Sequence, residues 1–517
     1  MDLDRLESLL QPASYPEPTG TVQHLQTHIS HLFLTDQYVY KLKKTVDFGF
    51  LDFTTLEKRR HFCHEEVRLN RRLSPDIYLG VVELRDDGHG GLCFTGEGEV
   101  REYAVKMRRL PGERMLDHLL DTGGVSRADM EAIAAVLARF HAGAVTGPRI
   151  AAFGAPAALR ANWLEDLRQT EQYRGITLSV DDHRLIGDWA LATLTHDGAL
   201  FERRIAGGFI RECDGDLHSG NICLDGQVHI FDGIEFNEQF RFSDTAADVA
   251  FLAMDLENHG RRDLAEAFVA DYRVASGDDG VASVLPFYLL NRAFIRGKVE
   301  SFRLSALEIP RAEQEAAADR ARRFFRLSRG YLLRCRLPAT LFITCGPTGC
   351  GKSSLAEELA FQLGFCHIQA DQVRKRLAGV AVTARGAPIY TPAWNRATYS
   401  RLAELAGREL SVGRSVLVDA TFQRRSDRRK CAALALQYGV RLVILVVAAP
   451  AQLIRERLER RSREGGSVSD GTWQVYQRQI ASFEPPQPDE GLLVSVDARQ
   501  NLVTQVEQVL AGIGLFS

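Results

Sequence analysis

The sequence lacks the features of a disulfide-stabilised, zinc-bound or membrane-spanning protein. Its nine cysteines are scattered singly among 517 residues and form no CxxC pair, so neither a disulfide framework nor a zinc ribbon is expected. There is no run of the ~20 uncharged apolar residues that a helix needs to cross a bilayer. The first residues, MDLDRLESLL, are acidic, whereas a secretory signal begins with basic residues. These absences predict a soluble, cytoplasmic protein without a membrane partner.

The composition is that of a folded chain with more than one domain. Apolar residues make up 45% of the sequence and charged residues 25%, which is enough to bury a sizeable core. At roughly 150 residues per domain, the length predicts two or three domains. Residues 336–517 carry 23 Lys and Arg against 16 Asp and Glu, although the whole chain has a net charge of −3. This basic segment suits an anionic ligand and places a domain boundary at 335/336.

The segment after residue 336 alternates short apolar runs with helical patterns. Five runs are predicted as strands: 341–345, 367–371, 415–420, 441–449 and 492–498. Three helices are predicted: 355–363, 399–410 and 452–463. Because the strands lack polar alternation, both faces of their sheet should be covered. The alternation predicts an α/β domain with a five-stranded parallel sheet.

The first 335 residues follow a different order, with strands first and helices later. Residues 28–44 are predicted as a hairpin that turns at Asp36-Gln37, and a charged helix is predicted over about 56–73. Beyond Asp117 the pattern is mostly helical, with strand and loop between 212 and 236. This segregation predicts a two-lobed α+β domain.

The C-terminal domain begins with a phosphate-binding motif. Residues 346–353, GPTGCGKS, match GxxxxGK[ST] at every fixed position, between an apolar strand and a helix. In such loops backbone N–H groups surround phosphate oxygens at a helix N-terminus. Lys352 is expected to bridge the β- and γ-phosphates, and Ser353 to hold Mg²⁺. The predicted nucleotide-binding residues are Gly346, Pro347, Thr348, Gly349, Cys350, Gly351, Lys352, Ser353 and Ser354.

Other residues of this domain suit phosphoryl transfer. Asp371, at the end of a predicted strand, can take the proton of an attacking hydroxyl, and Arg374 follows it. Asp419 also ends an apolar strand, where a carboxylate can hold the Mg²⁺ shell. Arginines on the helix after the fourth strand could clamp phosphates or simply form a solvated helix face: Arg457, Arg460 and Arg461. Aromatic residues could line an acceptor pocket or belong to the core: Tyr390 and those within 394–399.

Residues 338–517 resemble the small P-loop kinases that include polynucleotide kinases, zeta toxins and gluconate-kinase-like proteins. The resemblance rests on GPTGCGKS, ADQVRKRL, VLVDATF and the arginine-bearing helix. It implies that Asp371 is the general base and that Arg374 contacts the substrate or a phosphate.

A second set of phosphotransferase residues lies upstream. The sequence DGDLHSGN over 214–221 is followed by VHIFD over 228–232. A kinase needs a carboxylate near the acceptor hydroxyl, an amide oxygen on Mg²⁺ and a carboxylate that bridges metal and phosphates. Asp216, Asn221 and Asp232 supply these groups in order, with the DxxxxN spacing of kinase catalytic loops. The competing interpretation is a polar turn between two strands.

This region resembles the aminoglycoside phosphotransferase branch of the protein-kinase-like fold, whose loop reads HGDLHxxN. Nearly the whole chain is similar to a bacterial fusion family in which such a domain precedes a P-loop domain. The similarity includes FGFLDFTTLEKRRHFCHEEVRLNRRL, AVKMRRLP, ARFHA and IFDGIEFNEQFR. Asp214 stands where that family usually has histidine. A carboxylate beside Asp216 could raise a pKa or recruit a cation, or it could mark a lobe without catalysis.

A kinase of this kind also pairs a strand lysine with a helix glutamate. Lys41 is the predicted lysine, with Lys43 as the alternative on the same strand face. Glu66 is the predicted glutamate, with Glu65 as the alternative, and surface salt bridges are the competing interpretation. Three neighbouring residues could ligate a metal, but their spacing on a helix prevents convergence: His61, Cys63 and His64.

Together these patterns predict a bifunctional phosphotransferase whose two domains use Mg-ATP to phosphorylate hydroxyl groups of small molecules. No spacing in the sequence identifies the acceptors. One alternative is a polynucleotide 5′-hydroxyl kinase in the C-terminal domain, although its basic helix lacks the aromatic residues on which single strands stack. Another is an ATP-sensing regulator with one inactive lobe, for which Asp214 is the main support.

Overall fold

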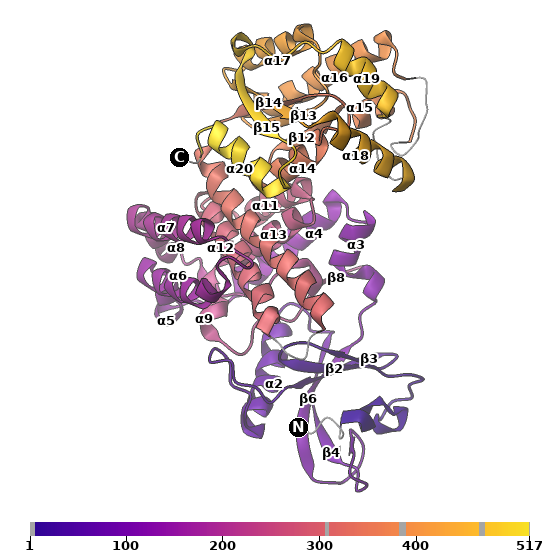
Figure 1. Cartoon of the computed structure of the whole chain (residues 1–517). Helices are drawn as coiled ribbons and strands as arrows, with labels where there is room; N and C mark the ends of the chain where they lie inside the picture. The colour runs from indigo at the N-terminus through magenta and orange to yellow at the C-terminus, as the bar shows by residue number, and fades with distance from the viewer. Residues whose placement is uncertain (1–5, 306–309, 382–388, 465–470, 516–517) are drawn as a thin grey trace. The chain divides into compact units, whose positions relative to one another are not determined.

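A computed structural model describes residues 6–305, 310–381, 389–464 and 471–515. The chain divides into two compact units, Met1–Phe325 and Arg326–Ser517, which run from indigo to yellow in Figure 1. The division falls inside helix α13 (Arg311–Arg336), whose last residue adjoins the predicted boundary at 335/336. Each described helix is too short or too polar to span a membrane.

The N-terminal unit begins with a six-stranded antiparallel sheet in the order β1-β2-β3-β6-β4-β5. Its strands are β1 (Gln23–Gln26), β2 (Ser30–Leu34), β3 (Tyr38–Lys43), β4 (Tyr78–Asp86), β5 (Leu92–Cys93) and β6 (Val100–Arg108). The predicted hairpin is confirmed, because β2 pairs with β3 and Leu34 lies opposite Val39. Side chains alternate along β3, so Tyr40 enters an apolar cluster on one face while Lys41 points to the other.

Helix α2 (Leu56–Asn70) packs against β4 and β6 of this sheet. The Thr55 side chain caps the helix by accepting a hydrogen bond from the Lys58 N–H. Helix α2 therefore begins as predicted and ends three residues before the expected end at 73. Its buried face includes Cys63, Glu66 and Val67. The Glu66 carboxylate is therefore buried on the face of α2 that packs against the sheet.

The rest of this unit is mostly helical, as expected. The longer helices are α3 (Leu116–Thr122), α4 (Arg127–Gly143), α6 (Pro156–Thr170), α7 (Val180–His196), α8 (Gly198–Ala206), α10 (Thr245–Asn258), α11 (Arg262–Ser276) and α12 (Val281–Phe302). The short helices are α5 (Pro148–Ala151) and α9 (Glu238–Arg241). Between α8 and α10 lie two antiparallel pairs: β7 (Ile210–Glu212) with β10 (Phe242–Asp244), and β8 (Ile222–Leu224) with β9 (Val228–Ile230).

The C-terminal unit contains the predicted five-stranded parallel sheet, in the order β12-β13-β11-β14-β15. Its strands are β11 (Thr340–Cys345), β12 (Cys366–Gln369), β13 (Val416–Asp419), β14 (Arg441–Ala448) and β15 (Leu492–Asp497). Its helices are α14 (Lys352–Leu363), α15 (Ala370–Leu377), α16 (Pro392–Ser411), α17 (Arg425–Gln437), α18 (Ala451–Glu464), α19 (Trp473–Ala481) and α20 (Leu502–Gly512). Two apolar clusters cover the two faces of the sheet, as the uniformly apolar strands require.

The strand predicted over 367–371 is shorter than expected. It ends at Gln369, and α15 begins at Ala370, so Asp371 lies in the first turn of a helix rather than at the end of a strand. Helices α15, α17, α19 and α20 were not predicted. The central strand β11 lies between β13 and β14. Ligands of open parallel sheets bind beyond the carboxyl ends of such strands.

Candidate active sites

The predicted P-loop connects β11 to α14 in the C-terminal unit. Gly349 and Gly351 have φ values of 78° and 106°, a region that residues with a Cβ rarely adopt. A Cβ at Gly349 would also lie 2.9 Å from the Leu458 side chain. The loop is anchored at its start, where the Gly346 N–H donates to the Thr421 carbonyl at 3.1 Å. The glycines of the motif are therefore required by its backbone and its close packing.

The polar residues of the motif meet the end of β13. Ser353 Oγ donates to Asp419 Oδ2 at 2.7 Å, and Thr344 Oγ1 donates to Asp419 Oδ1 at 3.0 Å. Lys352 Nζ donates to the Pro347 carbonyl at 2.7 Å. A hydroxyl and a carboxylate so placed offer the oxygen ligands that Mg²⁺ prefers. Ser353 and Asp419 could thus hold a divalent cation next to Lys352.

The charge of Asp419 is stabilised although the side chain is buried. Burial by itself raises its pKa, but His367, Lys352 and Ser353 together hold the pKa below the ordinary value. The His367 Nε2 lies 3.9 Å from Asp419 Oδ2. Sequence reasoning missed His367, because only the pairing of β12 with β13 brings it to this carboxylate.

Asp371 and Arg374 lie on one face of α15, three residues apart. Arg374 Nη1 donates to Asp371 Oδ1 at 2.9 Å, and Nη2 donates to Asn395 Oδ1 at 3.0 Å. The guanidinium carbon lies 4.7 Å from the centre of the Tyr390 ring. Arg374 is 7% exposed, so these partners hold it in one place. Asn395, which belongs to none of the sequence motifs, is part of the same cluster.

The predicted aromatic residues behave differently from one another. Tyr390 stacks on Arg374, whereas the Tyr399 hydroxyl accepts a hydrogen bond from the Phe422 N–H at 3.3 Å and lies 3.4 Å from Thr421 Oγ1. Tyr399 therefore packs against the segment that follows β13. Of the two, Tyr390 is the one placed beside the Asp371 cluster.

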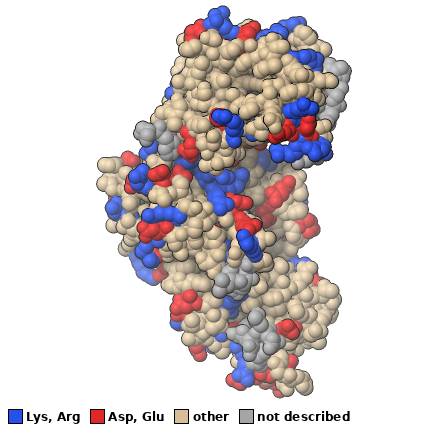
Figure 2. All heavy atoms as spheres, in the orientation of Figure 1, with Lys and Arg blue, Asp and Glu red and all other residues tan. Residues whose placement is uncertain are grey.

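The arginines of α18 are bonded to backbone carbonyls. Arg457 donates to Cys350 O at 3.2 Å and to Ala498 O at 2.8 Å, and Arg461 donates to Gly471 O at 2.7 Å. Arg460 is exposed. Figure 2 shows blue and red side chains mixed over α18, where Arg455 pairs with Glu459 at 2.9 Å. Arg457 thus connects α18 to the P-loop by a hydrogen bond. Phosphate binding by the arginines of this helix stays a prediction.

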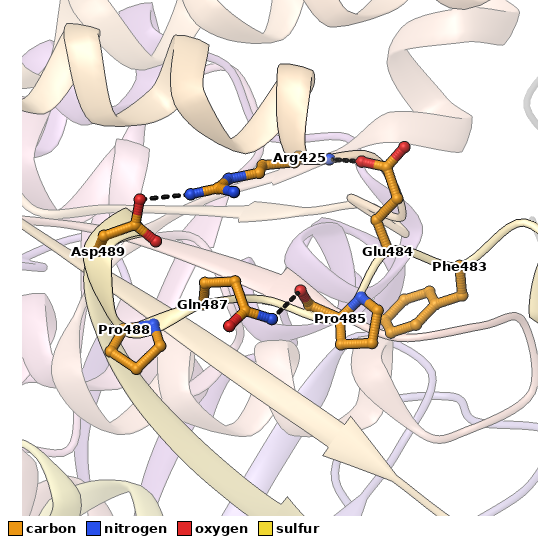
Figure 3. A pocket seen from close by; sticks show the side chains of 7 residues that line it. All are labelled: Arg425, Phe483, Glu484, Pro485, Gln487, Pro488 and Asp489. Atoms are coloured by element: carbon orange, nitrogen blue, oxygen red, sulfur yellow. Dashed lines mark hydrogen bonds and ion pairs between the residues drawn. The ribbon is translucent and has the colours of Figure 1, made fainter.

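A hollow of about 770 Å³ lies beside the Pro-rich turn after α19. Figure 3 shows its lining, in which Arg425 contacts both Glu484 and Asp489. The lining residues are Arg425, Phe483, Glu484, Pro485, Gln487, Pro488 and Asp489. They are distinct from the predicted nucleotide-binding residues, so this hollow is separate from the P-loop.

In the N-terminal unit, two strand lysines and one helix glutamate form a buried network. Lys41 Nζ donates to Glu66 Oε1 at 2.8 Å, and Lys43 Nζ donates to Glu66 Oε2 at 2.7 Å. Lys41 also contacts Asp232, and Lys43 contacts Glu235. The two lysines are therefore joint partners of Glu66 rather than alternatives. The other proposed glutamate, Glu65, pairs instead with Arg68 at 2.8 Å.

The network keeps Lys41 and Glu66 in their charged forms. Burial by itself lowers the pKa of Lys41, but the carboxylates of Asp232 and Glu66 raise that pKa well above its ordinary value. Burial likewise opposes ionisation of Glu66, yet the charges of Lys41 and Lys43 hold its pKa below the usual range. Glu235, which sequence reasoning missed, is buried with a raised pKa because burial outweighs the attraction of Lys43.

Asp232 follows β9 in an uncommon backbone conformation. Its φ of 62° is left-handed, which costs a non-glycine residue on the order of 1–3 kcal/mol. The Asp232 N–H donates to the Tyr78 hydroxyl at 2.9 Å, and the Gly233 N–H donates to Asn70 Oδ1 at 2.8 Å. Residues of β4 and α2 thus hold the Asp232 segment next to Lys41.

The predicted catalytic loop brings Asp216 and Asn221 together. Asn221 Nδ2 donates to the Asp216 carbonyl at 3.1 Å, which leaves its Oδ1 for another partner. His218 Nε2 lies 3.6 Å from Asp216 Oδ2. Burial opposes ionisation of Asp216, but His218 and Arg296 hold its pKa below the ordinary value. Asp216 is therefore an ionised carboxylate.

Asp214 is hydrogen-bonded to the backbone of this loop. One of its carboxyl oxygens accepts the Asp216 N–H at 3.1 Å, and Asp248 accepts the N–H groups of Asp214 and Gly215 at 2.9 and 3.0 Å. Burial, followed by the charge of Asp248, raises the pKa of Asp214 well above its ordinary value. The raised pKa thus belongs to Asp214, while that of Asp216 is lowered.

The helical trio that was predicted not to bind metal lies on α2. Cys63 is buried and contacts the Tyr103 carbonyl at 3.8 Å, while His61 and His64 are exposed. Within the described parts of the chain, the only cluster of three potential ligands is elsewhere and is made of His141, Cys213 and Asp248. Asp248 there already accepts the two N–H groups of the catalytic loop.

Two family models match the chain. The model of the phosphotransferase enzyme family matches residues 38–287, and that of an AAA domain matches residues 341–486. Uncharacterized proteins of Mycobacterium tuberculosis (strain ATCC 25618 / H37Rv) and Mycobacterium bovis (strain ATCC BAA-935 / AF2122/97) are 33% identical over 457 residues. Each alignment covers 87% of this chain and 88% of the relative.

Solved structures are similar to part of the chain. A sugar kinase from Janibacter sp. HTCC2649 is 21% identical with a TM-score of 0.27, covering 34% of this chain and 95% of that chain. A gluconokinase from Sinorhizobium meliloti 1021 is 23% identical with a TM-score of 0.26, covering 34% of this chain and 93% of that chain.

Proposed function

We propose that this chain, which belongs to the family of proteins in which a phosphotransferase domain precedes a P-loop domain, is a bifunctional ATP-dependent phosphotransferase. Its two domains identify it as a kinase. In the proposal, residues 1–335 form a two-lobed protein-kinase-like domain and residues 336–517 a P-loop kinase domain. Each transfers the γ-phosphate of Mg-ATP to a hydroxyl group of a small molecule.

The observation that carries the proposal is the meeting of Lys352, Ser353 and Asp419 at the carboxyl end of the parallel sheet. Ser353 and Asp419 are hydrogen-bonded at 2.7 Å and are the residues that would hold Mg²⁺. When bound, Mg²⁺ neutralises the charge that develops on the transferred phosphoryl group. The Lys352 ammonium reaches the β- and γ-phosphates from the same loop.

Asp371 is the proposed general base of the P-loop domain. A base must lie within hydrogen-bond reach of the acceptor hydroxyl and be held in place. The 2.9 Å bond to Arg374, which is itself held by Asn395 and Tyr390, supplies that positioning. The guanidinium of Arg374 is then the group that contacts the acceptor or the transferred phosphate.

Asp216 is the proposed base of the N-terminal domain. Its ionised carboxylate takes the proton of the acceptor hydroxyl, and the hydrogen bond from Asn221 Nδ2 to the Asp216 carbonyl keeps the loop in place. Asn221 Oδ1 and the Asp232 carboxylate are the oxygens that would hold Mg²⁺. Lys41, fixed by Glu66, is left to bind the α- and β-phosphates.

The test is a transfer assay on the full chain with radiolabelled ATP, hydroxyl metabolites and 5′-hydroxyl oligonucleotides. We expect two sets of labelled products. Asp371→Asn should lower transfer to one set by roughly 10²–10⁴-fold and Asp216→Asn should do so for the other, with ATP affinity within a few-fold of wild type. The control is Asp181→Asn, because the Asp181 side chain is 81% exposed and remote in sequence from both motifs.

Three results would contradict the proposal. Absence of any labelled product would exclude transfer to the tested acceptors. A loss of ATP binding in Asp371→Asn that matches its loss of transfer would make Asp371 a metal or structural residue. Products limited to oligonucleotides would identify a polynucleotide kinase instead.

A further inference from the structure

Helix α19 contacts the P-loop through Gln479, a residue that the motifs do not include. The Thr348 N–H donates to Gln479 Oε1 at 2.7 Å. The residue at the start of this segment, Gly471, also approaches Thr348, since a Cβ on Gly471 would lie 1.9 Å from Thr348 Oγ1. Thr348 is therefore the P-loop residue that the α19 segment contacts.

The other end of α19 is also attached to the nucleotide-binding region. The Glu484 N–H donates to the Gln423 carbonyl at 2.9 Å, and its carboxylate accepts the Arg425 N–H at 2.6 Å, as Figure 3 shows. Gln423 and Arg425 follow β13, the strand that bears Asp419. Helix α19 thus links the P-loop to the segment after the proposed metal ligand, and this fixes the position of Gln479.

Gln479 and Lys352 hold the same peptide group of the P-loop. Lys352 Nζ donates to the carbonyl of Pro347 at 2.7 Å, and the N–H of that peptide, on Thr348, is the one that Gln479 accepts. The C=O and N–H of a trans peptide point in opposite directions. The two side chains therefore set the orientation of the peptide that lies next to the lysine.

The remaining atoms of the Gln479 amide are suited to an anion. Its oxygen is used by Thr348, and none of the residues that the structure describes accepts a hydrogen bond from its Nε2, which carries two donors. Because Lys352 reaches the β- and γ-phosphates, the peptide beside it marks the end of the loop where a terminal phosphate lies. A donor at that place can bind an oxygen of the γ-phosphate.

We propose that Gln479 recognises the γ-phosphate, so that the P-loop site distinguishes a nucleoside triphosphate from a diphosphate. The inference rests on the proposed nucleotide binding of the P-loop domain. In it, Gln479 Oε1 stays on the Thr348 N–H while Nε2 donates to a γ-phosphate oxygen. A hydrogen bond to such a charged acceptor is worth more than a neutral one.

The test is calorimetry on the full chain with Mg²⁺, comparing ADP with a non-hydrolysable ATP analogue. Binding at this site is the part of the titration that Lys352→Ala removes. Gln479→Glu keeps an oxygen for Thr348 but replaces the donor by a negative charge. We expect its affinity for the analogue to fall about tenfold or more and its affinity for ADP to stay within about twofold. Gln477→Glu makes the same charge change at an exposed position of α19 and should alter neither affinity.

Equal losses for both nucleotides would show that Gln479 only shapes the loop, and no loss for either would show that it does not contact the phosphate. Both results overturn the inference and leave the proposed function intact. If Lys352→Ala removes no part of the wild-type titration, the proposed nucleotide site fails, and the inference fails with it.

Discussion

The two units each bury a lysine at a proposed phosphate site, but they hold it in opposite ways. Lys41 is 6% exposed and Lys352 is 8% exposed. Lys41 is bound by the carboxylates of Glu66 and Asp232, whereas Lys352 is bound by the carbonyl of Pro347 in its own loop. One site is a network of charges from distant segments, and the other is a local backbone structure.

This difference has a consequence for charge. The N-terminal network contains two ammonium groups, Lys41 and Lys43, and three carboxylates, Glu66, Asp232 and Glu235. The buried members of this network, which are all but Asp232, are stable only while each charge keeps its partners. The P-loop lysine depends less on charged partners, because it is bonded to a carbonyl oxygen and acts on the buried Asp419 only through its charge. The same substitution of the lysine in each unit should therefore lower the free energy of unfolding by unequal amounts.

The largest effect is expected from Lys41→Met, compared with Lys352→Met. Removing Lys41 leaves the Glu66 carboxylate buried with one partner fewer, which should lower the free energy of unfolding of the N-terminal unit by about 3–5 kcal/mol. Lys352→Met removes one hydrogen bond to a carbonyl and a positive charge that acts on Asp419, and should cost less, about 1–2 kcal/mol. Both losses of unfolding free energy can be measured by urea unfolding of the full chain, with hydrogen exchange of peptides from each unit as the probe.

An exposed lysine supplies the control for this pair. Lys430 is 62% exposed, so Lys430→Met should leave both unfolding transitions unchanged within about 0.5 kcal/mol. Equal losses of stability in Lys41→Met and Lys352→Met would contradict the contrast between the two lysines, since they would mean that the charge network adds nothing to the stability of its unit.

A smaller effect is expected from Ser353→Ala, which tests the proposed cation site of the P-loop unit. Loss of the hydroxyl that bonds Asp419 at 2.7 Å should weaken nucleotide binding about tenfold in the presence of Mg²⁺. In EDTA the variant and the wild type should bind alike. Ser400→Ala, at an exposed position of α16, is the control. A tenfold loss that persists in EDTA would assign the hydroxyl to the nucleotide rather than to a cation.

The smallest effect concerns two buried carboxyl groups whose pKa values differ from the ordinary value in opposite directions. The pKa of Asp214 is raised in the folded state, so its contribution to stability is complete below the unfolded pKa and is lost as pH rises through the folded value. The pKa of Asp419 is lowered, so its contribution is lost as pH falls through its folded value. Each tenfold change in an acid dissociation constant corresponds to about 1.4 kcal/mol of stability.

Asp214→Asn, which imitates the neutral acid, should therefore gain stability relative to wild type as pH rises from about 4 to 7, by on the order of 1 kcal/mol. Asp419→Asn should instead lose stability relative to wild type as pH rises from about 2 to 4, because the folded pKa of Asp419 lies below its ordinary value of 3.8. Urea unfolding at several pH values measures the two differences. Parallel pH profiles for the two variants would refute the opposite directions of the two pKa values.

The C-terminal unit was predictable to a large extent because its signals are local. The five strands, their parallel arrangement and the P-loop follow from short apolar runs and one contiguous motif, and the structure contains all five strands. The boundary between β12 and α15 was missed, since propensity alone does not decide where a strand becomes a helix. In the N-terminal unit the hairpin and the helix carrying Glu66 were found, while the hairpin formed by β1 and β2 was not.

By itself, the sequence determined which residue types are available for phosphoryl transfer: the glycines and Lys352 of one loop, and Asp216, Asn221 and Asp232 at kinase spacing. Only the tertiary structure decided that Lys43 and Glu235 join the N-terminal site and that Gln479 joins the P-loop site. The reason is physical. A motif records contacts between neighbours in the chain, whereas these partners meet through strand pairing and helix packing between segments as many as 192 residues apart.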